Sequence, residues 1–245
     1  MKNSFLALVC LFLALASCKK EETPNPDPTP INPTPTLSYR QGAGVTDVDG
    51  NCYKSVIIKF SSGTNKSTIE QEWMMENLRT KKNPDGSEID PYFVTKMSYC
   101  NNDSTTVDSL GILYTWDALM NNSTVAGSQG VCPNGWHIPT IGEYNTLING
   151  LGGNTAAGKK MKSTNATYWN DITKSDNTSG FNAHGTGWAM GQGMVVHYLN
   201  ATMFWTSTED GSDAKIIQLN SHEVGIFNQY GSSKSTKVSC RCIKN

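Results

Sequence analysis

Short apolar runs separated by polar turns begin at residue 53, and the first two runs predict a β-hairpin. Residues 53–58 (YKSVII) are rich in aromatic and β-branched side chains, which favour strands. Residues 47–51 (DVDGN), just before them, carry Asp, Gly and Asn, which are typical of a turn. Residues 72–78 (EWMMENL) fit the returning strand, although a short helix has the same spacing. The polar stretch that follows, to residue 108, is expected to be irregular.

The apolar spacing becomes helical between residues 140 and 150. Thr140 stands three residues before Glu143, which is the spacing of a capping box. Apolar side chains then recur at the three- and four-residue spacing of a helix face, at Tyr144, Leu147 and Ile148. We expect the main helix at about residues 140–150, ended by the glycines at 152 and 153. A shorter helix is expected at residues 114–120 (YTWDALM).

The last third of the chain has short apolar runs at residues 203–206, 216–219, 224–227 and 238–243. These runs lie close together in the sequence, which favours antiparallel pairing. The predicted fold class is therefore α+β, with small antiparallel sheets, one main helix and long loops.

The N-terminal 36 residues predict export and anchoring. Residues 1–17 combine a basic start, an apolar run and small residues, which is a signal peptide. Residues 15–18 (LASC) resemble a bacterial lipobox, so we expect Cys18 to carry lipid and to anchor the chain in a membrane. The Pro-rich remainder of residues 18–36 is a semi-rigid tether, and residues 37–245 form a single domain. Residues 19–22 (KKEE) resemble an export signal, and we expect an outer-membrane protein exposed at the cell surface.

Composition argues against several partners. The formal net charge is −1 and 17% of residues are charged, so no basic stripe for nucleic acid is present in the sequence. Of the seven cysteines, Cys10 would leave with the signal peptide and Cys18 would carry lipid, so five remain. No pair has the spacing of a zinc or redox site, and the four histidines are scattered. We therefore expect no metal and no cofactor.

Ordered blocks of sequence resemble the Fibrobacter succinogenes major paralogous domain, which occurs in bacterial surface proteins. The resemblance covers roughly residues 45–245 and is most specific at residues 129–140 (QGVCPNGWHIPT). The other blocks are DVDGN at 47–51, WMMENL at 73–78, GILYTW at 111–116, LGG at 151–153, AGKKMKS at 157–163, SGFNA at 179–183, FWTS at 204–207 and RC at 241–242.

The resemblance implies a fold similar to the C-type-lectin-like domain, with the N- and C-terminal strands paired. It also implies a disulfide between Cys132 and Cys242. For a second bridge we expect Cys52 with Cys240, which requires the first and last strands to be neighbours and leaves Cys100 free.

Calcium-dependent lectins use Glu-Pro-Asn or Gln-Pro-Asp and then Trp-Asn-Asp. This chain has NPD at residues 83–85 and WND at residues 169–171, but the first precedes the main helix and the second lies far from the C-terminus. Residues 47–51 lack the remainder of a twelve-residue calcium loop. We interpret all three segments as turns or packing residues.

An enzyme is not expected. Formylglycine-generating enzymes have a related fold and use a cysteine pair near the C-terminus, but Cys240 and Cys242 are readily explained as disulfide partners. His137 is interpreted as a core or loop-anchoring residue rather than a general base.

Two functions remain open. In the first, the domain is a non-catalytic binding module for a glycan or host ligand, with Trp188, Tyr198 and Trp205 as stacking residues. In the second, it is a structural or accessory lipoprotein of a fimbria or assembly, and the same aromatic residues belong to the core. Residues 103–105 (DST) and 108–110 (DSL) also resemble acceptor motifs for O-glycosylation, on Ser104 and Ser109.

Overall fold

The computed structural model describes residues 37–62, 67–93, 95–191, 193–227 and 230–245. Small antiparallel sheets and a few short helices make it an α+β protein, as the sequence predicts. The described residues belong to one compact unit that spans Pro35–Asn245. The expected signal peptide, Cys18 and the tether lie outside the described residues, so their assignment stays a prediction.

The largest sheet contains the predicted first hairpin and also the last strand. The returning strand of the hairpin lies at Ser67–Met74, earlier than the predicted residues 72–78. Its order is β1-β4-β5-β14-β8, with β4 and β5 in register from Ser55 opposite Met74 onward. β14 lies between β5 and β8, where Ile243 pairs with both Trp73 and His137. The strands of this sheet are β1 (Ser38–Gln41), β4 (Ser55–Ser62), β5 (Ser67–Met74), β8 (Trp136–His137) and β14 (Ile243–Lys244). The N- and C-terminal parts of the domain therefore share one sheet.

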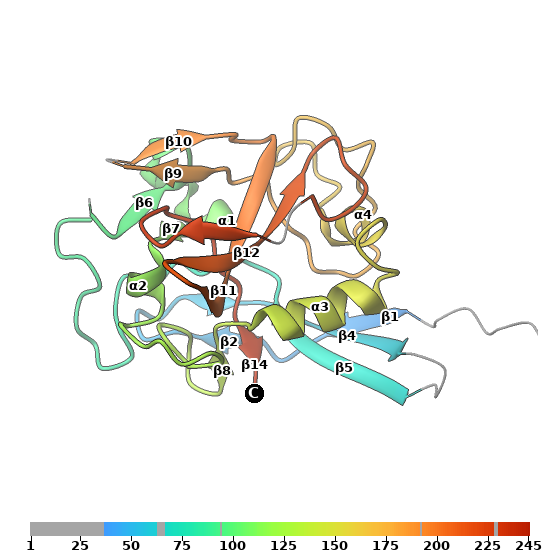
Figure 1. The fold of residues 1–245 in the computed structure, drawn as a ribbon, viewed down its shortest axis with the longest axis horizontal. Helices are drawn as coiled ribbons and strands as arrows, with labels where there is room; N and C mark the ends of the chain where they lie inside the picture. The colour runs from blue at the N-terminus through green and yellow to red at the C-terminus, as the bar shows by residue number, and fades with distance from the viewer. Residues whose placement is uncertain (1–36, 63–66, 94, 192, 228–229) are drawn as a thin grey trace, which may run out of the picture. The chain divides into compact units, whose positions relative to one another are not determined.

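The main helix α3 (Ile141–Gly150) confirms the predicted capping box. The Thr140 hydroxyl accepts from the Glu143 backbone N–H at 3.2 Å, and the Glu143 carboxylate accepts from the Thr140 backbone N–H at 2.8 Å. The helix lies along the β4–β5 hairpin (Figure 1) and buries Tyr144, whose ring centre is 4.7 Å from that of Trp73. Its apolar face therefore closes one of the hydrophobic clusters of the domain.

A second sheet has the order β11-β12-β13 and includes two of the predicted C-terminal strands. Ala201–Asp210 (β11) is buried through its first seven residues, so both faces of this strand are covered. It pairs antiparallel with Asp213–Asn220 (β12), which pairs with Gly231–Ser233 (β13).

The other elements are short and form the loop-rich part of the fold. Two of them, β9 and β10, make a hairpin on the opposite side of the view from β4 and β5 (Figure 1). These elements are β2 (Val45–Thr46), β3 (Cys52–Tyr53), β6 (Met97–Tyr99), 3-10 turns at Cys100–Asn102 and Ser104–Thr106, α1 (Val107–Leu110), β7 (Ile112–Tyr114), α2 (Trp116–Leu119), α4 (Ala157–Met161), β9 (Trp188–Met190) and β10 (Met194–Val196).

The predicted strand at residues 224–227 is wrong. This segment is a loop, because its backbone groups bond to separate parts of the chain rather than to one neighbouring strand. The Ile226 N–H donates to the Asn154 carbonyl at 2.7 Å, and the Val224 carbonyl accepts from the Lys159 N–H at 2.6 Å.

The predicted strand at residues 238–243 is mostly an irregular connection. Only Ile243 onward is a regular strand. Before it, single bridges join Lys237 to Ala189, Val238 to Tyr114 and Ser239 to Phe204, so one segment touches three different strands in turn. The segment therefore ties the small sheets together instead of extending one of them.

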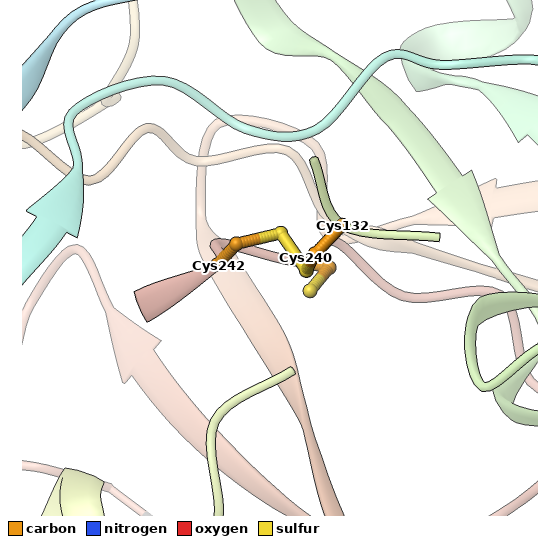
Figure 2. Close-up of side chains that lie close together, drawn as sticks. All are labelled: Cys132, Cys240 and Cys242. Carbon is orange, nitrogen blue, oxygen red and sulfur yellow. A yellow bond between two sulfur atoms is a disulfide. The ribbon is translucent and has the colours of Figure 1, made fainter. Parts of the chain in front are cut away.

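The expected disulfide between Cys132 and Cys242 is present (Figure 2), with 6.0 Å between the two Cα atoms. It joins the loop before α3 to the residue before β14. The chain-entropy model gives a loop of roughly 100 residues about 4.7 kcal/mol of stabilisation.

The expected second bridge, Cys52 with Cys240, is not present. Cys52 is exposed on β3, whereas Cys240 is fully buried beside the Cys132–Cys242 bond, with all three sulfur atoms within 4.8 Å of one another (Figure 2). The first and last strands share a sheet, but Cys52 lies on the separate β2–β3 ribbon, so this condition for the pairing fails. Cys100 is a free buried thiol, as expected.

Candidate functional site

A groove of about 580 Å³ lies beside the end of β12 and combines aromatic rings with amide side chains. It is formed by the start of β9, the loop after β10, the C-terminal half of β12 and the loop that follows β12. Its lining residues are Trp188, His197, Asn200, Ala201, Gln218, Asn220, His222, Glu223, Phe227 and Tyr230.

Trp188 forms one wall of the groove. It begins β9, pairs with Val196 of β10 and is half-buried. Its ring stacks on the ring of His197, with 4.5 Å between centres and 21° between planes. The two rings present a broad apolar surface that retains polar edges.

The loop after β10 has a strained backbone. His197 and Leu199 have φ of 58° and 61°, in the left-handed region that non-glycine residues seldom adopt. Hydrogen bonds fix this conformation: the Leu199 N–H donates to the Gly185 carbonyl at 2.7 Å, and the Leu199 carbonyl accepts from the Asn170 N–H at 2.9 Å. Such strain costs on the order of 1–3 kcal/mol per residue and is concentrated at functional sites.

Amide groups form the floor of the groove. Gln218 is 5% exposed, and its Nε2 donates to Asn220 Oδ1 at 2.9 Å while its Oε1 accepts from the Tyr230 hydroxyl at 3.3 Å. In the described part of the chain, Asn220 Nδ2 has no hydrogen-bond acceptor. A buried, hydrogen-bonded amide next to a free donor is a suitable polar anchor for a ligand hydroxyl.

The rim of the groove carries exposed rings. Phe227 is 50% exposed and Tyr230 is 44% exposed. The Phe227 N–H donates to the Gln218 carbonyl at 2.9 Å, which joins this part of the rim to β12. Exposed rings beside a polar floor suit a ligand that has apolar faces and polar edges.

The remaining wall carries the charges of the site. His222 Nδ1 lies 3.2 Å from Asp171 Oδ2. Hydrogen bonds from Thr173, first from its hydroxyl and then from its backbone N–H, together with a smaller effect of His222, lower the pKa of Asp171 to about 2. Asp171 is therefore ionised across the physiological range. The described residues that line the groove include no lysine and no arginine.

The three aromatic residues predicted to bind ligand occupy different environments. Trp188 lines the groove. Tyr198 does not: it packs against the cluster that contains Cys100, so the loop turns its ring away from the groove. Trp205 is 0% exposed and its Nε1 donates to the Tyr114 carbonyl at 2.8 Å, so it is a core residue and the prediction that it stacks on ligand is wrong.

Residues 47–51 form a turn, as predicted. Asp47 accepts from the backbone N–H groups of Asp49 and Asn51, from the Asn51 amide and from the Tyr53 hydroxyl at 2.6 Å. Both carboxylate oxygens of Asp47 accept hydrogen bonds, and these bonds stabilise the turn.

His137 is a loop anchor, as predicted. Its Nε2 lies 2.8 Å from Glu143 Oε1 and its Nδ1 lies 2.7 Å from Asn245 Oδ1. The hydrogen bond with Glu143 raises the pKa of His137, against the effect of burial. Both ring nitrogens are thus engaged in joining α3 to the C-terminal strand.

Most of the groove was not predicted from the sequence. Gln218 and Asn220 alternate with the buried Ile217 and Leu219 along β12, and that alternation was the available indication that two amides share a face. Phe227 and Tyr230 gave no such indication, because the loop that carries them has no regular period.

Comparison with known families agrees with the motif blocks. The model of the Fibrobacter succinogenes major domain matches residues 69–244, which is more than half of the chain. The protein therefore belongs to this family. No curated protein and no solved structure matches the chain. Within the described residues, no helix has both the length and the apolar character needed to cross a bilayer.

Proposed function

We propose that this protein is a lipid-anchored, non-catalytic binding module displayed on the outer membrane, and that its groove binds a neutral glycan. The observation that carries the proposal is the combination of Trp188, Phe227 and Tyr230 with the amides of Gln218 and Asn220 in one groove. Sugar rings have apolar faces that pack on aromatic rings and hydroxyl groups that pair with amides. No lysine or arginine is present among the described lining residues, which favours a neutral sugar over an acidic one.

A C-type-lectin-like arrangement is part of this proposal. It is supported by the shared sheet of the N-terminal hairpin and the last strand, by the single long helix and by the loop-rich region that carries the groove. The absence of catalysis is also a proposal: Cys242 is engaged in a disulfide, and both ring nitrogens of His137 are engaged in hydrogen bonds.

The proposal is tested with the full chain, purified in detergent, on an array of plant and host glycans. We expect specific binding that Trp188→Ala and Phe227→Ala each weaken at least tenfold, which is about 1.4 kcal/mol. Tyr92→Ala is the matched control, because Tyr92 is an aromatic residue that is 83% exposed and lies outside the groove. Binding that survives both groove substitutions would reject the groove as the site.

A structural or accessory role is the second candidate, and the burial of most tryptophans favours it. Trp73, Trp116, Trp136, Trp169 and Trp205 are all core residues, which leaves Trp188 as the half-buried member. If the array shows no binding and the protein instead copurifies with a defined surface assembly, this second function replaces the first.

A further inference from the structure

The loop after β12 forms the charged wall of the groove through His222 and Glu223. This loop is not a strand, so the pairing of a sheet does not fix its shape. Contacts with another segment, α4 and Lys162, fix it instead.

The backbone of α4 lies directly against the loop. A Cβ atom added to Gly158 would lie 2.0 Å from the Gly225 carbonyl oxygen, so only glycine allows this approach. The neighbouring Lys159 N–H donates to the Val224 carbonyl at 2.6 Å. The two segments therefore touch without an intervening side chain.

Lys162 binds the first part of the same loop. Its Nζ donates to the carbonyl oxygens of Asn220 at 2.7 Å, Ser221 at 3.1 Å and Glu223 at 2.6 Å. The side chain is fully buried, and Nζ lies 5.5 Å from the centre of the Trp169 ring. An ammonium group has three donors, and here each of them has a carbonyl acceptor.

Three converging backbone carbonyls resemble part of the oxygen shell of a hard cation such as calcium. Here the ammonium group, a compact charge on a tether, occupies their centre. Burial lowers the pKa of Lys162 to about 8, with Asp171 and Glu223 opposing the shift, so the group is cationic at neutral pH. A side chain that only filled space would not place a buried charge against three carbonyl groups.

We propose that Lys162 is a built-in cation that holds residues 220–223 in the shape of the groove wall, so that the groove needs no calcium. Lys162 is thus a positioning residue for the glycan site. This inference rests on the proposed function for its consequence in binding, but the shape of the loop can be measured without any ligand.

Hydrogen–deuterium exchange of the full chain in detergent tests the positioning role. Lys162→Met keeps an unbranched four-atom stem but removes the ammonium group, with its charge and donors. We expect the amides of Ser221 and Ile226, which donate to the Asn200 and Asn154 carbonyls, to exchange at least tenfold faster, while β4 and β5 keep their protection. Lys160→Met, two residues earlier at the end of α4, is the control and should leave the rates unchanged. Unchanged exchange at 221–226, or equal acceleration throughout the domain, would overturn the proposal.

Chemical rescue distinguishes a cation from a space filler and does not require that Lys162→Met folds well. Lys162→Ala removes three carbons and the ammonium group, which together correspond to n-propylammonium. We expect millimolar n-propylammonium to restore protection of residues 221–226, and 1-propanol at the same concentration to have no effect. Rescue by both compounds, or by neither, would contradict the assignment of a cation.

If the array identifies a glycan, its binding separates this inference from the proposed function. We expect equal affinity in calcium and in EDTA for the natural chain, and at least a tenfold loss in Lys162→Ala that n-propylammonium reverses. Loss of affinity in EDTA for the natural chain would reject the calcium-independent wall, while the glycan function would stand.

Discussion

Trp188 begins β9 and Trp205 lies in the middle of β11, and their surroundings give them different roles. The Trp205 ring is fully buried and its N–H is satisfied by the Tyr114 carbonyl. The Trp188 ring is half-buried, is stacked on His197 and faces the groove. Burial therefore decides which of the two contributes to stability and which is available to a ligand.

Trp205→Ala should destabilise the domain by about 3–5 kcal/mol, because it removes a large buried ring and leaves a cavity. Trp188→Ala should lower the free energy of unfolding by clearly less than Trp205→Ala, because the Trp188 ring is already partly exposed to water in the folded state. Urea unfolding followed by circular dichroism measures both changes. Similar losses for the two variants would mean that Trp188 also belongs to the core.

The pair of His137 and Glu143 should make stability depend on pH. The hydrogen bond with Glu143 raises the pKa of His137, so its stabilising effect is complete below about pH 6.5 and is lost as pH rises through the folded-state pKa. The natural chain should therefore be more stable than His137→Gln near pH 5.5, and this advantage should be smaller near pH 8. Urea midpoints at the two pH values measure the difference. His222→Gln, at an exposed ion pair, is the control. A constant gain would show that charge on His137 contributes nothing.

At the scale of elements, the helices are fixed by different kinds of contact. α3 carries its own cap and apolar face, so local sequence is enough to define it. α4 is five residues long and has no side-chain cap, and its place depends on the approach of Gly158 to the Gly225 carbonyl. Replacing a glycine by alanine should therefore raise the stability in α3 and lower it in α4.

Gly142→Ala should stabilise α3 by about 0.5–1 kcal/mol, because alanine favours helices and a Cβ there meets only Thr140 Oγ1 at 3.7 Å. Gly158→Ala should destabilise the domain and weaken groove binding, because the added Cβ displaces the loop that carries the groove wall. Thermal unfolding and glycan binding measure the two effects. Unaltered binding in a folded Gly158→Ala protein would show that the loop can move without damage to the groove.

The same contrast explains how much could be predicted from the sequence. The first hairpin, α2, α3 and two C-terminal strands have local patterns, and each was predicted. The loop at residues 224–227 has an apolar run like that of a strand, but its bonds to Asn154 and Lys159 come from about 70 residues earlier. The groove likewise joins β9, β12 and two loops. Of its lining residues only Trp188 was predicted to bind ligand, and the alternation of Gln218 and Asn220 was the other signal in the sequence.

At the scale of the whole molecule, a disulfide bond and the buried side chain of Arg241 hold distant segments together. The Cys132–Cys242 bond ties the loop before α3 to the last strand. Next to it in sequence, the fully buried Arg241 donates to the carbonyls of Phe181 and Asn182 and to Asn77 Oδ1. The C-terminal segment is thus fixed on several sides at once.

Cys132→Ser should lower the free energy of unfolding by about 2–5 kcal/mol, because the unfolded chain loses its cross-link. Cys52→Ser should change it by less than about 0.5 kcal/mol, since Cys52 is exposed and unbonded. Calorimetry of the two variants under non-reducing conditions measures the contrast. A large loss in Cys52→Ser would indicate a bridge through that residue in the exported protein.

Export and anchoring predict a mass that intact-protein spectrometry can read. We expect the mature chain to begin at Cys18 with acyl groups attached, and Cys18→Ala to abolish both the added mass and retention in the membrane fraction. Additional mass on peptides that contain Ser104 or Ser109, which are exposed, would reveal modification there. A chain of unmodified mass that still begins at Met1 would reject the lipoprotein assignment.

The position of β14 has a consequence for biogenesis. Ile243 pairs with Trp73 on one side and His137 on the other. If the protein is exported, as we propose, the middle of the largest sheet is therefore vacant until residue 243 has crossed the inner membrane. Contacts between residues so distant in sequence form slowly. During that export the β4–β5 hairpin has an unpaired edge on β5. Unpaired strand edges can pair with other chains and cause aggregation. Periplasmic chaperones that shield strand edges should therefore be more important for the yield of this protein than for that of a domain whose sheets close in sequence order.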